Sequence, residues 1–360
     1  MTTTPLGKQT VPPRVRADET TMTAVVQDSY GSEPADVLRL TVIDRPTFTA
    51  GQVLVRVHAA SVDRGTWHIM AGLPYPIRLA GFGLRRPKYA NPGRNLAGTV
   101  EAIGADVTTF APGDAVFGMA TSTFAEYAVA GPEKLAPKPA NLTFDQAAAV
   151  PVSGSTALQA VRDHGRVQAG EKVLIIGASG GVGSFAVQIA KGFGAEVTGV
   201  AGPAKLDLVR SLGADHVLDH SREDFADGGP RFDVVLDIGG NSGLARLRRA
   251  ITPRGRLVIV GGETDGRLLG GSSRQIRATL LSPFVSQTLG SFIATENAAD
   301  LTALTELIEA GQVSPTIDRI YPLAETAAAI RHLLDGQARG KLVVSVSAAD
   351  MPTPGSRSTQ

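Results

Sequence analysis

The chain has 360 residues, of which 43% are hydrophobic, 19% charged and only 5% aromatic, and this composition excludes a largely disordered or fibrous protein. Its 35 lysine and arginine residues nearly balance 34 acidic residues, so the formal charge of +1 gives no global field to attract nucleic acid or an anionic membrane. The lack of any cysteine excludes disulfides, thiolate nucleophiles, iron–sulfur clusters and every zinc site that needs a thiolate.

The length and the local composition predict two domains between two short tails. Residues 1–21, rich in threonine and proline, and residues 349–360 are expected to be flexible. Residues 22–150 contain strand-like runs separated by glycine and proline, which predict a mainly β domain. The clearest runs are 24–26, 37–40, 52–57 and 98–103. No run approaches the roughly 18 apolar residues of a membrane span, and we expect a cytoplasmic protein.

Residues 151–298 have a different pattern. Thr143 is expected to cap a short helix that ends before Pro151, and a second helix is predicted from about Ser155 to Asp163. From residue 171, apolar strands alternate with helical segments, which is typical of a parallel sheet with helices on both faces. Beyond this domain, residues 299–348 contain two amphipathic helices and a final strand at 342–346.

A glycine-rich turn after the first buried strand, 172–176, carries the strongest functional signal. It matches an A-x-G-x-x-G form of the dinucleotide-binding fingerprint, in which Gly180 lets the backbone approach a pyrophosphate and Gly183 lets the helix pack on the strand. Its place between a strand and a helix favours this interpretation over a turn without a ligand. The expected cofactor contacts are Ala178, Ser179, Gly180, Gly181, Val182 and Gly183.

The same turn also satisfies G-x-S-x-G, the nucleophile elbow of α/β-hydrolases. Ser179 is followed by Asp237 and His332 in the order that such a triad requires. However, an elbow does not need Gly183, and no HGGG-like oxyanion loop precedes the turn. We therefore expect the Ser179 hydroxyl to lie beside a pyrophosphate.

The end of the second strand of this domain indicates which nicotinamide cofactor is used. An NAD site usually has an acidic residue about 20 residues after the glycines, where it binds the ribose hydroxyls. Here residues 201–205 contain no acid but end in Lys205, which would accommodate a 2′-phosphate. This favours NADPH over NADH, although Lys205 could also be a solvated residue at a helix start.

With these features in place, the chain resembles the medium-chain dehydrogenase/reductase superfamily, and within it the zinc-free quinone oxidoreductase and enoyl reductase branch. The resemblance covers about residues 23–346, and besides the fingerprint it rests on several short motifs in family order. These are 93–98 (GRNLAG), 112–118 (PGDAVFG), 124–127 (FAEY), 151–157 (PVSGSTA) and 339–341 (RGK). It implies an α/β fold: a GroES-like, mainly β catalytic domain, made of residues 22–150 and 299–348, and a Rossmann NADP-binding domain with a doubly wound parallel sheet, residues 151–298.

The resemblance also indicates where zinc-dependent members bind their metal. Cysteine or histidine ligands would stand at Asp63, at Arg94-Asn95 and near Val152, and these residues cannot complete a zinc shell. Asp63, His58 and His68 could form a hard-metal site, but such residues are more often surface or cavity groups, so we expect no metal. The family often has asparagine where Asp63 stands and aspartate where Asn95 stands, which puts a catalytic role for Asp63 in doubt.

Without a metal, the reaction that we expect is hydride transfer to a conjugated acceptor, a quinone or an α,β-unsaturated ketone or aldehyde. Conjugation spreads the developing charge, so that polar donors or solvent suffice. By resemblance, Thr156 and Gly261-Gly262 border the nicotinamide, and Lys341 lies near the cofactor or the substrate carbonyl. The catalytic candidates are Asp63, Tyr75 and Lys341, and the cleft is expected to include Trp67, Tyr89 and Ser153 as well.

Other functions of the same fold stay open: a zinc-independent alcohol dehydrogenase or ketone reductase, and a non-catalytic nucleotide-binding protein. The cation cluster at residues 83–88 could receive an acidic substrate but is more typical of a solvated loop. The apolar stretch 278–285, late in the nucleotide-binding domain, predicts a homodimer that forms through the edge of its sheet. We expect a small-molecule substrate and no nucleic-acid or membrane partner.

Overall fold

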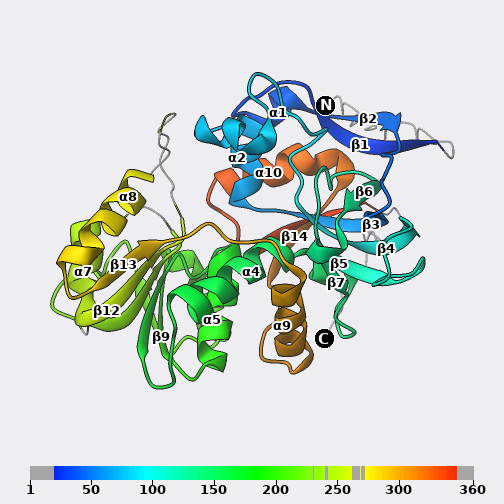
Figure 1. The fold of residues 1–360 in the computed structure, drawn as a ribbon. Helices are drawn as coiled ribbons and strands as arrows, with labels where there is room; N and C mark the ends of the chain where they lie inside the picture. The colour runs from blue at the N-terminus through cyan, green and yellow to red at the C-terminus, as the bar shows by residue number, and fades with distance from the viewer. Residues whose placement is uncertain (1–19, 230, 240–241, 262–267, 269–271, 347–360) are drawn as a thin grey trace, which may run out of the picture.

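The computed structural model describes residues 20–229, 231–239, 242–261, 268 and 272–346. Nearly all of both predicted tails, and Gly262, therefore lie outside the described residues. The described chain forms two domains side by side, a parallel α/β domain in green and yellow and a mainly β domain in blue, cyan and orange (Figure 1). Among the described residues, no helix has the length and apolar character needed to cross a membrane.

The nucleotide-binding domain contains a parallel sheet that, within the described residues, has six strands in the order β10-β9-β8-β11-β12-β13. This is the doubly wound order expected of a Rossmann fold. Its strands are β8 (Lys172–Ile176), β9 (Glu196–Ala201), β10 (His216–Asp219), β11 (Phe232–Asp237), β12 (Ile251–Ile259) and β13 (Thr288–Ser291). Its helices are α4 (Pro151–Gln159), α5 (Gly181–Gly192), α6 (Leu206–Ser211), α7 (Leu244–Ala250) and α8 (Ser272–Leu281).

The catalytic domain is built on a mostly antiparallel sheet in which β14-β15-β3-β4-β5-β7 are neighbours and β6 pairs with β3. Its strands are β3 (Val53–Val62), β4 (Asn95–Ile103), β5 (Ala115–Met119), β6 (Tyr127–Ala130), β7 (Leu135–Pro137), β14 (Ile317–Pro322) and β15 (Lys341–Ser345). A separate hairpin pairs β1 (Thr21–Gln27) with β2 (Leu38–Asp44). The helices are α1 (Pro34–Val37), α2 (Arg64–Ala71), α3 (Phe144–Ala148), α9 (Ala298–Glu309) and α10 (Thr326–Leu334).

Short 3₁₀ and π-helical turns complete the secondary structure. They are η1 (Arg78–Phe82), η2 (Pro132–Lys134), η3 (Ala160–His164), η4 (Pro203–Lys205), η5 (Ser282–Phe284) and η6 (Leu323–Glu325). The sequence placed the second helix too late: α4 begins at Pro151, four residues before Ser155, because proline is well suited to the first helical turn. The helix capped by Thr143 is confirmed, since the Thr143 hydroxyl accepts a hydrogen bond from the Gln146 backbone N–H.

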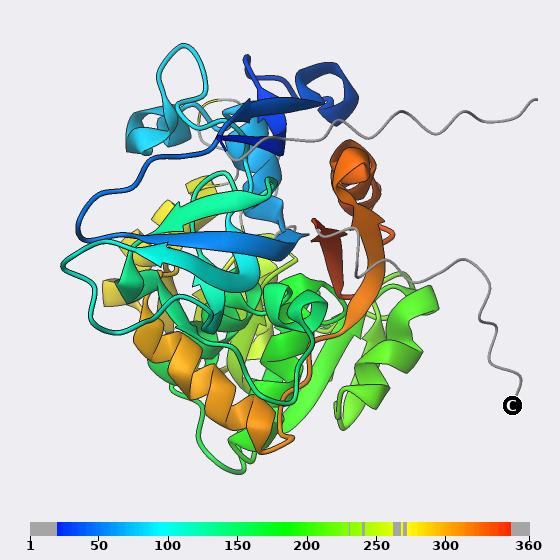
Figure 2. The same cartoon turned by 90° about the vertical axis from the view of Figure 1, so that its right-hand side faces the viewer.

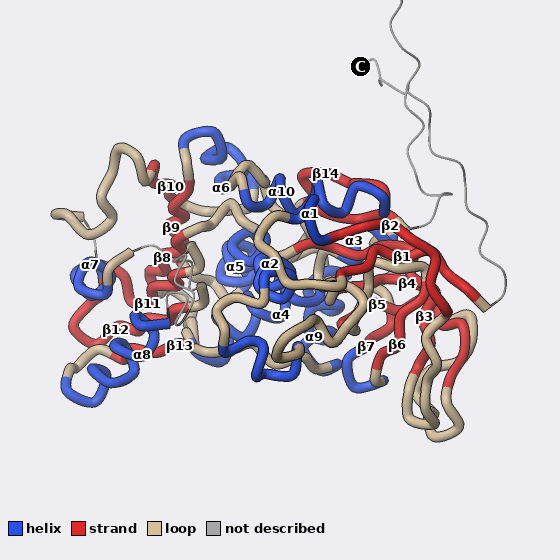
Figure 3. The backbone as a smooth tube through the Cα atoms, turned by 90° about the horizontal axis from the view of Figure 1, so that it is seen from above, coloured by secondary structure: helices blue, strands red, loops and turns tan. Residues whose placement is uncertain are grey.

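The two domains share one apolar core. A single buried cluster joins Phe117 and Met119 of the catalytic sheet to Val173 and Phe185 of the nucleotide-binding domain. Helices α4 and α5 lie between the two groups of strands (Figure 3), and α4 packs on both α5 and β5. Burial of each large apolar side chain contributes about 1.5–3 kcal/mol to stability, so this shared core stabilises the contact between the domains. The expected domain boundaries, 150/151 and 298/299, stay predictions.

Candidate cofactor and substrate site

The glycine-rich turn between β8 and α5 has the geometry of a dinucleotide cradle. Gly177 has a φ of +85°, and a Cβ on Gly183 would lie 2.1 Å from the Gly177 carbonyl oxygen, so neither position suits a larger residue. A Cβ on Gly180, by contrast, would meet nothing closer than 3.5 Å. The chain is therefore tightly packed behind the turn and open in front of Gly180, where the fingerprint needs room for a pyrophosphate.

The N-terminus of α5 is suited to an anion. Gly180 is its N-cap residue and supplies no side chain to accept from the first N–H groups, which have no partners within the helix. These N–H groups and the positive end of the helix dipole face the open side of the turn. The residues present therefore fit a dinucleotide. Ala178 and Ser179, which precede this end, are buried in the turn.

The catalytic domain contacts this turn directly. The Gly340 N–H donates to the Ser179 carbonyl oxygen at 2.9 Å, immediately before β15 begins. A Cβ on Gly181 would lie 3.1 Å from Cδ of Lys341 and 3.2 Å from the Ser153 hydroxyl. The first turn of α5, α4 and the start of β15 thus meet at one point, which Lys341 occupies.

Lys341 is a fully buried amine at this junction, with 1% of its surface exposed. Its Nζ donates to the Val62 carbonyl oxygen at 3.0 Å and to the Ser153 hydroxyl at 3.1 Å. Burial lowers the pKa of Lys341 below its ordinary value of 10.5, and the negative charge of Asp63 partly opposes this effect. The site therefore contains an amine that changes its protonation state more readily than a surface lysine does.

Asp63 belongs to a hydrogen-bonded network rather than to a ligand set. It is the N-cap residue of α2, where Oδ1 accepts from the Thr66 N–H at 3.0 Å, and its Oδ2 accepts from Nδ2 of Asn95 at 2.8 Å. The amide oxygen of Asn95 accepts from the Val152 N–H at 2.8 Å. The exchange of aspartate and asparagine relative to the family thus leaves a complementary pair that joins α2, β4 and α4.

The residues at the positions of a zinc site do not fit zinc. Arg94 forms an ion pair with Glu296 at 2.5 Å, and Lys134 joins it at 2.8 Å. Both cations lower the pKa of Glu296, although its burial acts in the opposite direction. Glu296 is occupied by two cations, and the Asn95 carboxamide is hydrogen-bonded to Asp63 and to the Val152 N–H, so these residues do not form a set of zinc ligands.

The hard-metal alternative does not assemble either. The His58 ring stacks on Phe144 at 4.2 Å, and its Nε2 contacts the Thr99 hydroxyl. His68 Nδ1 lies 2.8 Å from the Leu73 carbonyl oxygen, and burial lowers the pKa of His68. Over the part of the chain that the structure describes, no three histidine, cysteine or acidic residues are grouped so that they could hold a metal ion.

Lys205 lies at the end of β9, as expected, but its amine is already engaged. Nζ donates to the carbonyl oxygens of Gly336 at 2.7 Å and Ala338 at 2.8 Å, in the loop that leads to β15. Arg339, from the same loop, donates to the Ala204 carbonyl oxygen and to Asp207. Burial lowers the pKa of Lys205; Asp318 raises it and the nearby charge of Arg339 lowers it further. Two cations, one from each domain, therefore lie at the end of β9.

A buried ion pair at the end of β11 was not indicated by the sequence. Arg274 donates to Oδ2 of Asp237 at 2.7 Å and to the Gly261 carbonyl oxygen at 3.2 Å. Asp237 is fully buried at the end of β11, and Gly261 follows β12. The one signal in the sequence was Asp237 itself, an acidic residue directly after the apolar residues 234–236, because a buried carboxylate needs a charged partner.

The hydrolase triad is not formed. His332, on α10, contacts the Tyr321 hydroxyl at 2.6 Å and Asp318 at 3.2 Å, both on β14, while Asp237 is held by Arg274. Ser179 has neither partner beside it. The order Ser, Asp, His along the sequence was coincidental because these residues lie on three unrelated elements.

Several other expected residues make contacts with groups other than Lys341. Tyr75 is 40% exposed and lies against the guanidinium of Arg78, with its ring centre 4.8 Å away. Trp67 donates to the Ser32 carbonyl oxygen, and Tyr89 packs edge-on against Phe82. The Thr156 hydroxyl donates to the Val152 carbonyl oxygen one turn earlier in α4. Of the cleft residues named from the sequence, Ser153 is hydrogen-bonded to Lys341, and the charge of Asp63 acts on the same amine.

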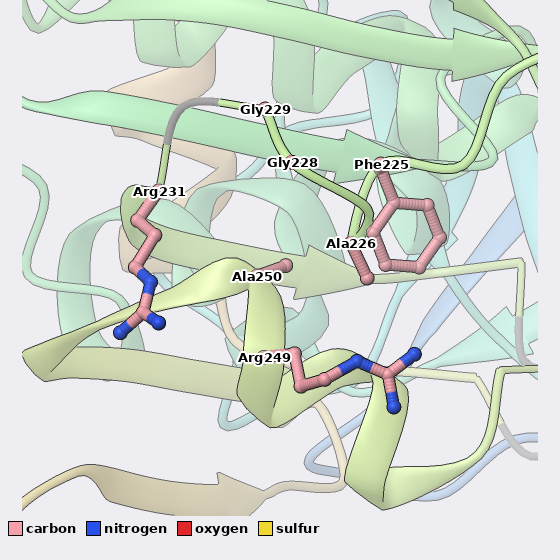
Figure 4. A pocket seen from close by; sticks show the side chains of 7 residues that line it. All are labelled: Phe225, Ala226, Gly228, Gly229, Arg231, Arg249 and Ala250. Atoms are coloured by element: carbon pink, nitrogen blue, oxygen red, sulfur yellow. The ribbon is translucent and has the colours of Figure 1, made fainter.

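A separate hollow of about 290 Å³ lies at the amino-terminal ends of β11 and β12, opposite the end of the sheet that carries the glycine turn (Figure 4). Cofactors of open parallel sheets bind at the carboxyl ends of the strands, so this hollow is not part of the same site. Its lining residues are Phe225, Ala226, Gly228, Gly229, Arg231, Arg249 and Ala250.

A dinucleotide cradle facing a buried amine of a second domain defines a two-domain oxidoreductase that uses a nicotinamide cofactor. Comparison with known proteins agrees. A family described as zinc-binding dehydrogenase matches residues 212–344, and one described as alcohol dehydrogenase GroES-like domain matches residues 49–140.

Three relatives cover most of the chain. The mitochondrial NAD(P)H oxidoreductase RTN4IP1 of Mus musculus is 33% identical over 92% of this chain and 90% of its own. The quinone oxidoreductase of Coxiella burnetii has a TM-score of 0.77 at 29% identity, over 91% of this chain and 100% of its own. The CurK enoyl reductase has a TM-score of 0.77 at 26% identity, over 91% and 99%. The chain belongs to the zinc-free branch of the medium-chain dehydrogenase/reductase superfamily.

Proposed function

We propose that this protein is an NADPH-dependent, metal-independent reductase of conjugated carbonyl compounds, either quinones or α,β-unsaturated ketones and aldehydes. The observation that carries the proposal is the buried amine of Lys341 beside the glycine turn. It lies near Asp63, one of the positions that resemble the zinc ligands of zinc-dependent members. Its donor set supplies hydrogen bonds and a proton, but no metal ligands.

The bound cofactor supplies a hydride, and the protein must then accommodate the negative charge that develops on the acceptor. A conjugated acceptor spreads this charge over an enolate or hydroquinone, for which a single good donor suffices. Lys341 has three N–H donors when charged, and its recorded partners are Val62 and Ser153. We propose that Lys341 Nζ donates to the developing oxyanion. The negative charge of Asp63 raises the pKa of Lys341 against the effect of burial and so favours the protonated amine.

The acceptor class is tested by turnover with chelator-treated protein and a panel of quinones, enones, enals and simple ketones. We expect NADPH oxidation with the conjugated compounds and little with simple ketones. Elemental analysis accompanies the assay. Stoichiometric zinc, or activity lost on chelation and restored by zinc, would end the metal-independent proposal, and binding without any turnover would favour a non-catalytic nucleotide-binding protein.

We also propose that NADPH is preferred over NADH. Residues 201–205 supply no carboxylate for ribose hydroxyls, and Lys205 and Arg339 both stand at the end of β9. One charge-assisted hydrogen bond to the 2′-phosphate contributes about 1.5–3 kcal/mol, or roughly a 10- to 150-fold preference. Because the Lys205 amine must leave two carbonyl oxygens to reach a phosphate, we expect the low end of this range.

Titration of both cofactors tests this preference, with the fluorescence of the bound cofactor as readout. NADPH should bind at least about tenfold more tightly than NADH, and Lys205→Ala should weaken NADPH but leave NADH nearly unchanged. Arg210→Ala, at an exposed cation on α6, is the matched control. Equal affinities in the wild type would overturn the NADPH proposal; an unchanged NADPH affinity in Lys205→Ala would remove only the role of Lys205.

Finally, we propose a homodimer that forms through the edge strand β13. The stretch 278–285 forms the end of α8 and the turn η5, and β13 follows as the edge of the parallel sheet. Four large apolar side chains around this edge are exposed, namely Ile276, Leu280, Phe284 and Ile293. A second copy would cover them and pair the free strand edge. Light scattering should give twice the monomer mass of 37.3 kDa, and Phe284→Arg should reduce it to the monomer.

A further inference from the structure

One segment of this chain carries positive charge without any acidic residue. Residues 64–100 contain six lysine and arginine residues and no aspartate or glutamate, although the whole chain is balanced to +1. This segment includes the connection between α2 and β4, which projects as an outlying lobe at the top of the catalytic domain (Figures 1 and 2). The net charge therefore hides a strongly cationic region.

Three of these six cations are exposed and close together in the sequence. Arg94 is paired with Glu296, Arg78 donates to the Gly72 carbonyl oxygen, and Arg64 lies over the Trp67 ring. The remaining cations, Arg85, Arg86 and Lys88, are exposed. Among the residues that the structure describes, no carboxylate lies within ion-pair distance of these three. They are available to an external anionic partner.

Two large apolar side chains accompany these cations. Leu79 is 77% exposed and Leu84 is 63% exposed, and both lie within a few residues of the cations in the segment 79–88, which we call the cationic loop. Four other exposed apolar residues lie around β13, where a second copy of the chain would cover them, namely Ile276, Leu280, Phe284 and Ile293. The leucines of the cationic loop have no such explanation.

The cationic loop is held in a shape that keeps these side chains outside. The Tyr30 hydroxyl lies 2.8 Å from the Phe82 carbonyl oxygen and 2.6 Å from that of Gly83, and the Lys88 N–H donates to the Phe82 oxygen at 2.8 Å. Gly83 has a φ of +106°, and a Cβ there would lie 2.1 Å from the Arg86 carbonyl oxygen. The tight turn at Gly83 thus presents Leu84, Arg85 and Arg86 together.

We propose that the cationic loop docks this protein on an anionic lipid bilayer. Cations near a negatively charged membrane gain electrostatic energy, and neighbouring leucines gain from insertion into the boundary between headgroups and acyl chains. An acidic protein would use the same charges, but it would also need a complementary apolar surface to cover the two exposed leucines. The proposal goes beyond the reductase activity and requires neither the cofactor nor turnover.

The test is vesicle flotation of the full chain, without cofactor, on phosphatidylcholine vesicles with or without phosphatidylserine. The wild type should bind the anionic vesicles, release them at high salt, and bind the neutral ones weakly. Arg85→Gln/Arg86→Gln/Lys88→Gln should lose roughly 100-fold in partition coefficient, at about fivefold per cation. Leu79→Ser/Leu84→Ser should lose about tenfold, because both leucines leave the interface.

A matched variant, Lys172→Gln/Arg210→Gln/Arg254→Gln, removes the same charge from exposed positions of the nucleotide-binding domain and should bind like the wild type. All substituted residues are exposed, and unchanged thermal unfolding would establish that each variant is folded. Equal binding of the wild type to neutral and anionic vesicles would overturn the proposal, as would an equal loss in the matched variant. Loss with the charge variant but not with the leucine variant would also overturn it as stated, because the bilayer contact would then be electrostatic without insertion of the leucines.

Discussion

The two domains contribute to the candidate cofactor site through different kinds of groups. On the nucleotide-binding side the site is backbone: glycines whose Cβ positions are blocked, and the free N–H groups of α5. On the catalytic side it is side chains from three elements: Asp63 and Asn95 are hydrogen-bonded to each other, and Lys341 is held by the Val62 carbonyl oxygen and the Ser153 hydroxyl. A backbone site is sensitive to added atoms, whereas a side-chain network is sensitive to a missing or misplaced donor.

The largest expected effect separates two glycines of the same turn. Gly183→Ala places its Cβ 2.1 Å from the Gly177 carbonyl oxygen and should reduce the free energy of unfolding by about 3 kcal/mol. Gly180→Ala, whose Cβ has 3.5 Å of room, should keep the stability within about 1 kcal/mol and instead weaken cofactor binding. Urea unfolding and cofactor titration of both variants check this. Equal destabilisation of the two would contradict the described packing.

The second prediction concerns the network on the catalytic side. Asn95→Leu leaves Oδ2 of Asp63 and the Val152 N–H without their recorded partner and should cost about 2–3 kcal/mol of stability. Asn95→Asp should also destabilise, since two carboxylates would then face each other.

The double variant Asp63→Asn/Asn95→Asp supplies the control for this network. It restores a donor opposite an acceptor and returns the order that is frequent in the family, so it should recover most of the stability lost in Asn95→Asp. A double-mutant cycle measures the recovery as a coupling energy, which we expect to be at least about 1 kcal/mol. Additive effects would mean that the two side chains do not depend on each other.

The contrast between the backbone part and the side-chain part of the site also explains what the sequence could predict. The fingerprint, the alternation of strands and helices and the helix capped by Thr143 follow from glycine spacing, apolar runs and local capping, all of which are local properties. The partners of Asn95, Arg274 and Arg339 could not be predicted, because each contact joins residues that are more than 30 positions apart or lie in different domains. Tyr75 was a candidate by residue type alone, and its exposed position depends on the path of the lobe.

The third prediction concerns the protonation of Lys341. Its pKa is lowered in the folded protein and ordinary in the unfolded chain, so between the lowered value and 10.5 the unfolded chain binds a proton that the folded one does not. The cost of burying the charged amine is fully present below the lowered pKa and disappears as the pH rises through this window. The free energy of unfolding of the wild type should therefore rise with pH relative to that of Lys341→Met. A difference between the two that is constant with pH would contradict the lowered pKa.

The smallest expected effect distinguishes the second cation at the end of β9. Arg339→Ala should weaken NADPH by roughly fivefold, as expected of a partly exposed charge, and leave NADH affinity unchanged. Isothermal titration of both cofactors measures it, and Arg210→Ala serves as the control for a general loss of charge. A parallel loss of NADH affinity would mean that Arg339 acts by holding the loop before β15 rather than by contacting a phosphate.

The most direct test of the proposed chemistry is the position of a label. The protein is incubated with NADPH that carries deuterium at the transferable position of the nicotinamide, together with an α,β-unsaturated ketone, and the product is analysed by NMR. Reduction of a conjugated acceptor predicts deuterium on the β-carbon of a saturated ketone, formed equally well after chelation. Deuterium on the carbonyl carbon of an allylic alcohol would contradict this account and identify a ketone reductase of the same fold.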